Sequence, residues 1–395
     1  MVNTLTPWQP FGDEVDPEQA GVDPAGLTAA LAEAGARGGH WQLVVWRGDQ
    51  LLIDRASGDP GLCWLWSASK PFIALLTWQL VEAGTIDVDT PLATWWPEFA
   101  ARGKQDITVR QVLQHRSGVP TGSGGQLADA LVMHDWEWST HRMAMSAPRW
   151  APGERSAYHY LSYGFMLGEL ARRATGRELP ELMDEQIFSP LGLGDLRLGL
   201  AADELGLAVP MDVEAPGGGL VEQLLNSDQV RQAVIPAAGI FGTARGLARF
   251  YRAMLGGGEL DGVRVARPET IAQMRQQSSI DGEPDGLLLY PARWGQGFQL
   301  GGPAVGWPAV EPFGRLSSRD SFGHNGSNAC TGWADPASGL VVAYIGNRMR
   351  GWQPDRMMLR RLADALHTAV SDESTSATAP RTPAEHDAPG RPGQE

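Results

Sequence analysis

The sequence predicts a mixed α/β fold of the α+β type, in which an antiparallel sheet built from both chain ends is flanked by helices and carries an inserted, mostly helical subdomain. β-rich runs separated by turn residues occur near the start (42–58) and near the end (293–349) of the chain. The long middle, roughly 72–255, has helical spacing broken by Pro and Gly. Strands at both ends with helices between them place the two ends in one sheet. We expect a single domain over residues 1–370, with the helical subdomain at about 85–235.

Individual segments support this arrangement. Residues 23–36 space Leu27, Leu31 and several alanines at helical intervals behind an Asp-Pro start, which predicts a first helix. Residues 42–58 contain two short β-rich runs joined by Arg-Gly-Asp, which predicts a hairpin. Four further strand candidates are expected at residues 293–302, 320–326, 328–336 and 339–349. A closing amphipathic helix is expected at residues 354–370.

Composition and charge exclude several classes of protein. The 395 residues are 43% apolar and 20% charged, as in a globular protein. No apolar run reaches the roughly 18 residues of a membrane span, and residues 1–19 lack the features of a secretory signal, so a cytoplasmic protein is expected. The net charge of −14 argues against nucleic acid or anionic membrane as a partner. Residues 371–395, with four prolines and no aromatic residue, are expected to form a disordered tail.

The sequence indicates neither a metal nor a cofactor. Cys63 and Cys330 are too few for a disulfide framework or a structural zinc site, and buried free thiols are expected. His134 and His141 have no third ligand at metal spacing. Walker, Gly-x-Gly-x-x-Gly, Gly-x-Ser-x-Gly and His-Glu-x-x-His motifs are all absent from the sequence.

Lysine is rare in this chain, because all but two of the 32 basic residues are arginine. One of the two, Lys70, follows Ser67 by three positions at the start of a predicted helix whose buried stripe is Phe72, Leu75, Leu76 and Leu80. A serine becomes a nucleophile when a base takes its proton, and a desolvated lysine can act as that base. The helix N-terminus also offers the Ser67 N–H to a developing oxyanion. Ser-x-x-Lys alone is a weak signal.

Two further segments carry candidate site residues. Tyr158 is expected in a loop ahead of a helix that begins near Ser162, where it is either functional or simply packed at the helix entrance. Residues 323–327, Gly-His-Asn-Gly-Ser, are expected at the start of a strand, where the glycines allow close approach of a ligand to the backbone. Read alone, a segment such as residues 323–327 is more often a simple β-turn.

Together the three features resemble the serine β-lactamase and penicillin-binding protein superfamily, in particular the class C β-lactamase-like branch that includes family VIII carboxylesterases. The resemblance spans about residues 15–370. It includes a "His-x-Ser-Gly" turn within 107–120, a "Gly-x-x-x-Thr-Ala" helix at 239–255 and the final strand pair at 333–349. It implies that residues 1–370 form one β-lactamase-like catalytic domain.

The resemblance also implies roles for individual residues. Ser67 would be the acylated nucleophile, Lys70 its proton-transfer partner, and Tyr158 the general base and then the acid toward the leaving group. The backbone N–H groups of Ser67 and Ser327 would form the oxyanion hole. The implied reaction is a two-step acyl transfer through an ester on Ser67.

The implied substrate contacts depart from the family pattern. His324, Asn325 and Gly326 stand where the family has Lys-Thr-Gly, and Tyr160 stands where it has Asn or Ser. A mostly neutral His324 loses the attraction of a lysine for a substrate carboxylate, which favours neutral esters over penicillins. Arg348 is a candidate substitute for that charge. Among the 15 tryptophans, Trp333, together with Trp64, Trp66 and Trp150, is a candidate for an apolar acyl pocket.

The leading expectation is therefore a cytoplasmic serine hydrolase, a carboxylesterase for small-molecule neutral esters, with weak β-lactamase activity left open. The same acyl-enzyme would serve an acyltransferase of natural-product biosynthesis, in which an alcohol or amine replaces water. Amide hydrolysis or D-aminopeptidase activity is a third alternative. A non-enzymatic binding protein is disfavoured because Ser67 and Lys70 are both present. The sequence assigns no oligomeric state.

Overall fold

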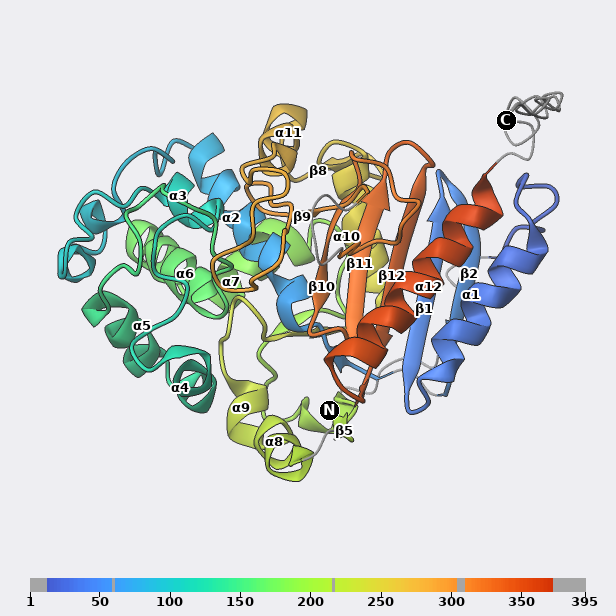
Figure 1. The fold of residues 1–395 in the computed structure, drawn as a ribbon, viewed down its shortest axis with the longest axis horizontal. Coiled ribbons are helices and arrows are strands. Elements are labelled where there is room, and N and C mark those ends of the chain that lie inside the picture. Colours follow the sequence, from blue (N-terminus) through green and yellow to red (C-terminus); the bar gives the residue numbers. More distant parts are fainter. Residues whose placement is uncertain (1–12, 59–60, 215–216, 304–309, 372–395) are drawn as a thin grey trace, which may run out of the picture.

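One antiparallel sheet joins the two ends of the chain (Figure 1). The computed structural model describes residues 13–58, 61–214, 217–303 and 310–371. Within them the six strands run in the order β2-β1-β12-β11-β10-β9. Their bounds are Trp41–Arg47 (β1), Gln50–Ala56 (β2), Gln299–Leu300 (β9), Phe322–Gly326 (β10), Cys330–Asp335 (β11) and Leu340–Gly346 (β12). The pairing of β1 with β12, which aligns Trp41 with Gly346, confirms the predicted sheet built from both ends.

Helices cover both faces of this sheet. α1 (Pro24–Ala36) and α12 (Trp352–Val370) pack against each other on the face nearer the viewer in Figure 1, and α10 (Ala244–Leu255) lies against the other face. The side chains of each strand alternate between two cores, as expected of a sheet buried on both sides. Leu43, Val45, Val342 and Tyr344 face α1 and α12, whereas Val44, Ala343 and Ile345 face the opposite core.

Both predicted terminal helices are confirmed. Asp23 caps α1 by accepting a hydrogen bond from the Ala25 N–H, and Pro24 fills the first helical position, where no N–H is needed. α12 begins at Trp352, two residues before the expected start, because Pro354 is tolerated inside a first turn.

The middle of the chain is mostly helical, as predicted. Its helices are η1 (Trp66–Ser69), α2 (Lys70–Glu82), η2 (Leu92–Thr94), η3 (Pro97–Ala100), α3 (Val109–Leu113), α4 (Gly125–Val132), α5 (Trp136–Met145), α6 (Ser162–Thr175), α7 (Leu179–Met183), η4 (Asp184–Phe188), η5 (Leu205–Leu207), α8 (Gly218–Leu225), α9 (Asp228–Gln232) and, after α10, α11 (Pro268–Arg275). Short strands interrupt or follow them: β3 (Cys63–Trp64), β4 (Arg197–Leu198), β5 (Asp212–Val213), β6 (Ile240–Gly242), β7 (Glu259–Leu260), β8 (Val263–Arg264) and β13 (Arg348–Met349).

α2 is the central helix of this region. Its first seven residues are all buried, and it packs against α6 and α11. The sequence predicted one buried stripe, but the helix is covered on nearly all sides, as its continuous apolar run Phe72 to Leu76 requires. This burial holds the N-terminal end of α2, and Lys70 with it, away from water.

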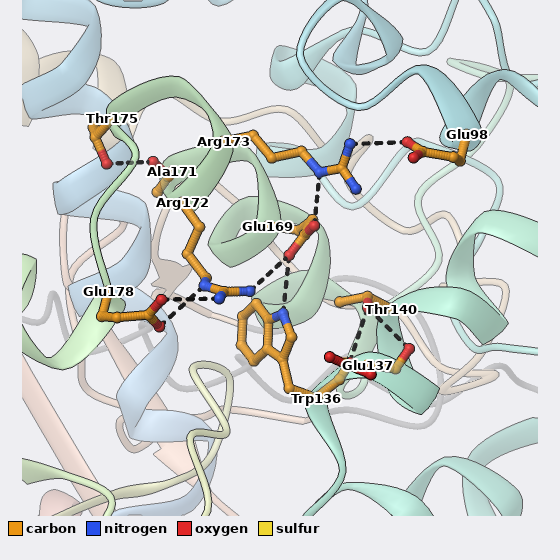
Figure 2. Close-up of polar contacts among 10 residues, drawn as sticks. All are labelled: Glu98, Trp136, Glu137, Thr140, Glu169, Ala171, Arg172, Arg173, Thr175 and Glu178. Atoms are coloured by element: carbon orange, nitrogen blue, oxygen red, sulfur yellow. Dashed lines mark hydrogen bonds and ion pairs between the residues drawn. The ribbon is translucent and has the colours of Figure 1, made fainter.

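A network of charges fixes the outer face of α6 (Figure 2). The buried Glu169 carboxylate accepts hydrogen bonds from Trp136 on α5 and from Arg173 Nε, at 2.9 and 2.7 Å. Arg173 then reaches Glu98 on η3 at 2.8 Å, and Arg172 reaches Glu178 ahead of α7 at 2.9 Å. These contacts tie α6 to α5, to η3 and to the residue that precedes α7. The expected limits of the helical subdomain, about 85–235, remain a prediction.

Neither cysteine is in a disulfide, and both are buried. None of the helices in the described ranges combines the length and the apolar character needed to span a membrane. The predicted tail at 371–395 lies, from residue 372 on, outside the described residues.

Candidate active site

Ser67 lies in a short 3₁₀ turn pressed against the small sheet β3-β6-β4. Trp66, just before it, has φ of +50°, a left-handed conformation that is strained for a bulky residue and turns the chain sharply into Ser67. The turn is fixed to β6 from two sides, because Leu65 N donates to Ile240 O at 2.8 Å and Ile240 N donates to Ser69 Oγ at 3.2 Å. Ser67 is 7% exposed.

Lys70 is brought next to Ser67 by one helical turn. Its Nζ lies 3.1 Å from Ser67 Oγ and 3.3 Å from Ala237 O. The side chain is almost completely buried, and this desolvation holds the pKa of Lys70 well below its ordinary value. A lysine in this environment can exist as a neutral amine, which is the form that accepts a proton.

Tyr158 contacts the same Ser67 oxygen as Lys70. It lies in the loop ahead of α6, which begins at Ser162 as predicted, and its Oη donates to Ser67 Oγ at 2.8 Å. Lys70 Nζ lies 4.7 Å from the centre of its ring. Burial raises the pKa of Tyr158, which keeps the phenol protonated. The structure thus brings Ser67, Lys70 and Tyr158 together around one hydroxyl.

Two side chains that the motifs did not predict, Asp285 and Trp294, contact Tyr158 together with His115 of the predicted His-x-Ser-Gly turn. The Tyr158 N–H donates to both carboxylate oxygens of Asp285 at 2.9 Å, and the Tyr158 ring stacks on Trp294 at 5.1 Å and 12°. The His115 ring lies 5.2 Å from it, and His115 Nδ1 accepts from His159 N at 3.1 Å. Asp285 and Trp294 are more than 120 residues away in sequence, and no local pattern links them to Tyr158.

Strand β10 brings the third predicted motif to the site. The structure makes these residues the strand itself, not its start, and the strand ends in a tight turn where Ser327 and Asn328 both have positive φ. His324 is 3% exposed, and its Nδ1 lies 2.7 Å from Asn325 O. Burial, reinforced by Lys70, lowers the pKa of His324 to about 3, so the ring is neutral at pH 7.

These groups line one cavity of about 410 Å³, within the size range of small-molecule sites. Of the residues singled out from the sequence, six line it: Ser67, Tyr158, Tyr160, His324, Asn325 and Ser327. Lys70 lies behind Ser67. Sequence reasoning missed much of the aromatic and charged lining, including Tyr290, Trp294, Trp352, Glu311 and Arg356.

Three residues expected to contact the substrate, Trp333, Arg348 and Gly326, do not line the cavity. Trp333 is fully buried on the opposite face of the sheet, against Phe313 and His367 under α12. The register explains this: Trp333 pairs with Gly323, whereas Gly332 pairs with His324, and neighbouring residues of a strand face opposite sides.

Arg348 and Gly326 are the other two corrections. Arg348 pairs with Asp212 at 3.2 Å and with Glu214, so its charge is neutralised beside β5 rather than presented to the cavity. Gly326 lies against η1, where a Cβ would come within 2.3 Å of Leu65 O. A glycine is therefore needed here because the backbone of Leu65 lies too close for a side chain.

The other tryptophans considered as pocket residues do not line the cavity either. Trp64 and Trp66 stack on each other at 4.5 Å, and Trp64 is 2% exposed. Trp150 lies over Gly286, which has no side chain to displace it. The aromatic wall of the cavity is instead made by Trp294, Trp352 and the tyrosines.

Comparison with known proteins identifies the family. The sequence profile of the Beta-lactamase family matches residues 28–367. The esterase/beta-lactamase LipL of Mycobacterium tuberculosis strain H37Rv is 31% identical over 340 residues, covering 77% of this chain and 74% of LipL. Esterase EstB of Burkholderia gladioli is 28% identical over 350 residues, covering 77% and 83%. The crystal structure of a family VIII carboxylesterase superposes with a TM-score of 0.72 at 27% identity, covering 88% of this chain and 98% of that one.

The chain belongs to the beta-lactamase family, within the β-lactamase and penicillin-binding protein-like superfamily of serine hydrolases. The mixed α/β fold with its antiparallel sheet is that of the structural neighbours. Both findings confirm the resemblance inferred from the motifs.

Proposed function

We propose that this protein is a serine carboxylesterase that hydrolyses small, uncharged esters through an acyl-enzyme on Ser67. One observation carries the proposal: Ser67 Oγ lies 3.1 Å from Lys70 Nζ and 2.8 Å from Tyr158 Oη at the wall of a cavity. The names of LipL, EstB and the family VIII carboxylesterase, which describe those proteins as esterases, support an ester as substrate.

In the acylation step, neutral Lys70 takes the proton of Ser67 as Oγ attacks the ester carbonyl carbon. The carbonyl oxygen becomes an oxyanion that faces the backbone N–H groups of Ser67 and Ser327. When the intermediate collapses, the bond to the alkoxy oxygen breaks, and Tyr158 donates its proton to that oxygen. Lys70 then returns a proton to Tyr158, which leaves both groups neutral. Water repeats the sequence on the acyl-enzyme and releases the acid.

The charges of the cavity support an uncharged substrate. Lys70 and Lys104 are the only lysines in the sequence, so no lysine occupies the third motif. His324, which takes that place, is neutral because its pKa is about 3. The other charged residues of the lining are two carboxylates, Glu311 and Asp355, and one arginine, Arg356. A substrate carboxylate would therefore lack the fixed attraction that a lysine supplies at close range.

The test is Ser67→Ala, compared with wild type on p-nitrophenyl acetate and by intact mass after incubation with esters, β-lactams, and alcohol or amine acceptors. We expect at least about a 1,000-fold loss of turnover and an acyl adduct on wild type only. Ser139→Ala is the matched control, because this serine is also buried but its hydroxyl donates to Val132 O on α4 and has no contact with Lys70. Wild-type turnover in Ser67→Ala would place the nucleophile elsewhere and refute the proposal.

A further inference from the structure

A buried carboxylate outside the three motifs touches the backbone of Tyr158. Asp285 is 2% exposed, and both of its oxygens lie 2.9 Å from Tyr158 N. Its Oδ2 also accepts from Trp294 Nε1 at 3.1 Å. Its Oδ1 accepts from the N–H groups of Leu287 and Leu288 at 2.9 and 3.0 Å. Four N–H donors therefore converge on one carboxylate.

The donors of Asp285 are all uncharged. Across the described ranges, no ion pair joins Asp285 to an arginine or lysine. Burying an anion without a cation carries a desolvation cost that hydrogen bonds must offset. Capping the turn at Leu287 and Leu288 is an ordinary role for aspartate, which exposed aspartates perform equally well. The bonds to Tyr158 and Trp294 are what this buried position adds.

These two bonds fix the phenol from two directions. One holds the backbone N–H of Tyr158, and the other holds the indole of Trp294, whose ring stacks on the Tyr158 ring at 5.1 Å and 12°. The segment that carries Asp285 is itself attached to the Tyr158 loop, because Gly286 N donates to Ser156 O at 2.8 Å. With backbone and ring plane both set, Oη is directed at Ser67 Oγ.

We propose that Asp285 is a positioning residue, which orients Tyr158 so that its hydroxyl delivers a proton to the leaving oxygen of the substrate. The inference rests on the proposed serine esterase function and adds a residue to it. Tyr158 transfers the proton, while Asp285 acts only through the geometry of its hydrogen bonds. The role predicts a specific dependence on the leaving group, because an alkoxide must be protonated to depart and a nitrophenolate leaves without that help.

The experiment is Asp285→Asn, measured on ethyl acetate and on p-nitrophenyl acetate. An amide offers one acceptor oxygen in place of two and turns its own N–H₂ toward N–H donors, so the grip on Tyr158 and Trp294 loosens. The quantity compared is kcat/KM, because it reports acylation, whereas kcat also contains deacylation of the acetyl-enzyme that both esters share. We expect kcat/KM to fall about 100-fold on the ethyl ester and less than about tenfold on the nitrophenyl ester. The ratio of the two kcat/KM values is the diagnostic.

Two further variants keep the test decisive. Asp281→Asn is the matched control: Asp281 lies four residues earlier in the same segment but pairs with Arg319 at 2.6 Å, and it should leave the ratio unchanged. Trp294→Phe keeps a stacking ring and removes the indole N–H, and it should shift the ratio in the same direction by a smaller factor. If Asp285→Asn fails to fold, the Trp294→Phe ratio decides.

The outcomes separate this inference from the function on which it rests. Activity surviving in Ser67→Ala would refute the esterase proposal itself. Suppose instead that Ser67→Ala is inactive and that Asp285→Asn lowers kcat/KM equally for both esters or leaves both values unchanged. Asp285 then only stabilises the fold, and the positioning role is overturned.

Discussion

The two lysines of this chain are both buried, yet their surroundings are opposite in kind. Lys104 Nζ donates to three carbonyls, those of Ala101, Ala144 and Ser146, at 2.5, 2.8 and 2.6 Å. Two of these carbonyls lie at the C-terminal end of α5, where the helix dipole favours a cation. Lys70 stands at the N-terminal end of α2, where the dipole disfavours one.

The difference shows that burial alone does not decide what a lysine does. Burial and the nearby Arg102 lower the pKa of Lys104 to about 8, so at pH 7 it is still a cation with an acceptor for each of its three protons. The pKa of Lys70 is held well below its ordinary value, with Ser67 Oγ and a single carbonyl as the partners of Nζ within the described residues. One lysine acts as a structural clamp and the other is available as a base.

The largest expected effect is on catalysis, where the same substitution by arginine should act differently at Lys70 and at Lys104. Lys70→Arg should lose at least about 1,000-fold in kcat/KM, nearly as much as Lys70→Ala, because a guanidinium stays protonated and cannot take the Ser67 proton. Lys104→Arg should stay within about tenfold of wild type. Steady-state kinetics on p-nitrophenyl acetate measure both, and a Lys70→Arg enzyme within tenfold of wild type would reduce Lys70 to a structural charge.

For the free energy of unfolding the order should be reversed, with the larger loss on substituting Lys104 and the smaller on substituting Lys70. Lys104→Met removes the donor from three carbonyls, two of them buried and that of Ala101 part-buried. The loss should cost about 3 kcal/mol in the free energy of unfolding, about 1 kcal/mol for each carbonyl. Lys70→Met should change stability by less than about 1 kcal/mol, because it removes a desolvated amine with few partners. Urea denaturation of the two variants tests this, and equal destabilisation would contradict the comparison.

Lowering the pH should destabilise the region around Tyr158 more than the region around Lys104. The buried histidines near Tyr158 are held neutral: the pKa values of His159 and His324 are lowered to about 4 and about 3, from an ordinary 6.5. Between those values and 6.5 the unfolded chain binds more protons than the folded one, so stability falls as pH falls, by about 1–2 kcal/mol per histidine between pH 7 and 5. Lys104 is protonated in both states there and contributes no change.

Hydrogen exchange at pH 7 and pH 5 measures this difference locally. Peptides covering 115–119 and 157–161 should lose protection, and those covering 101–104 and 144–146 should keep it. An equal loss of protection in all four peptides would show that the two regions respond to acid as one unit.

The smallest expected effect concerns the charge that the cavity lacks. His324→Lys should raise kcat/KM for an anionic β-lactam relative to a neutral ester by about tenfold, equivalent to about 1.4 kcal/mol, because a fixed ammonium attracts the carboxylate. The ratio cancels losses common to both substrates. A constant ratio from pH 6 to 8 would remove the electrostatic reason for preferring uncharged esters.

Local patterns predicted those parts of the molecule that local chemistry determines. The spacing of Ser67 and Lys70, the start of α6 at Ser162 and the sheet built from both ends all follow from residue periodicity and turn residues, and the structure has them. The contact between Tyr158 and Asp285 depends on how a loop folds over the site, which no periodicity records.

The errors have an equally physical cause. Trp333 was placed in the cavity because it lies close to His324 in sequence, but alternation along paired strands turns it to the other face. Arg348 was judged by its charge alone, and the carboxylates that neutralise it, Asp212 and Glu214, come from a distant segment.

The pairing of β1 with β12 has a consequence for how the protein is made. The pairing partner of Trp41, Gly346, is about three hundred residues later in the sequence, so β1 cannot pair with β12 until almost the whole chain has been synthesised. During synthesis β1 and β2 are a hairpin without a partner, while the helices between them and β12 are already complete. Ser327, at the turn before β11, takes its place in the cavity only when this last part of the chain has docked. A nascent or truncated chain would therefore carry Ser67 without the turn that we propose holds the oxyanion, and we expect it to be inert until folding is finished.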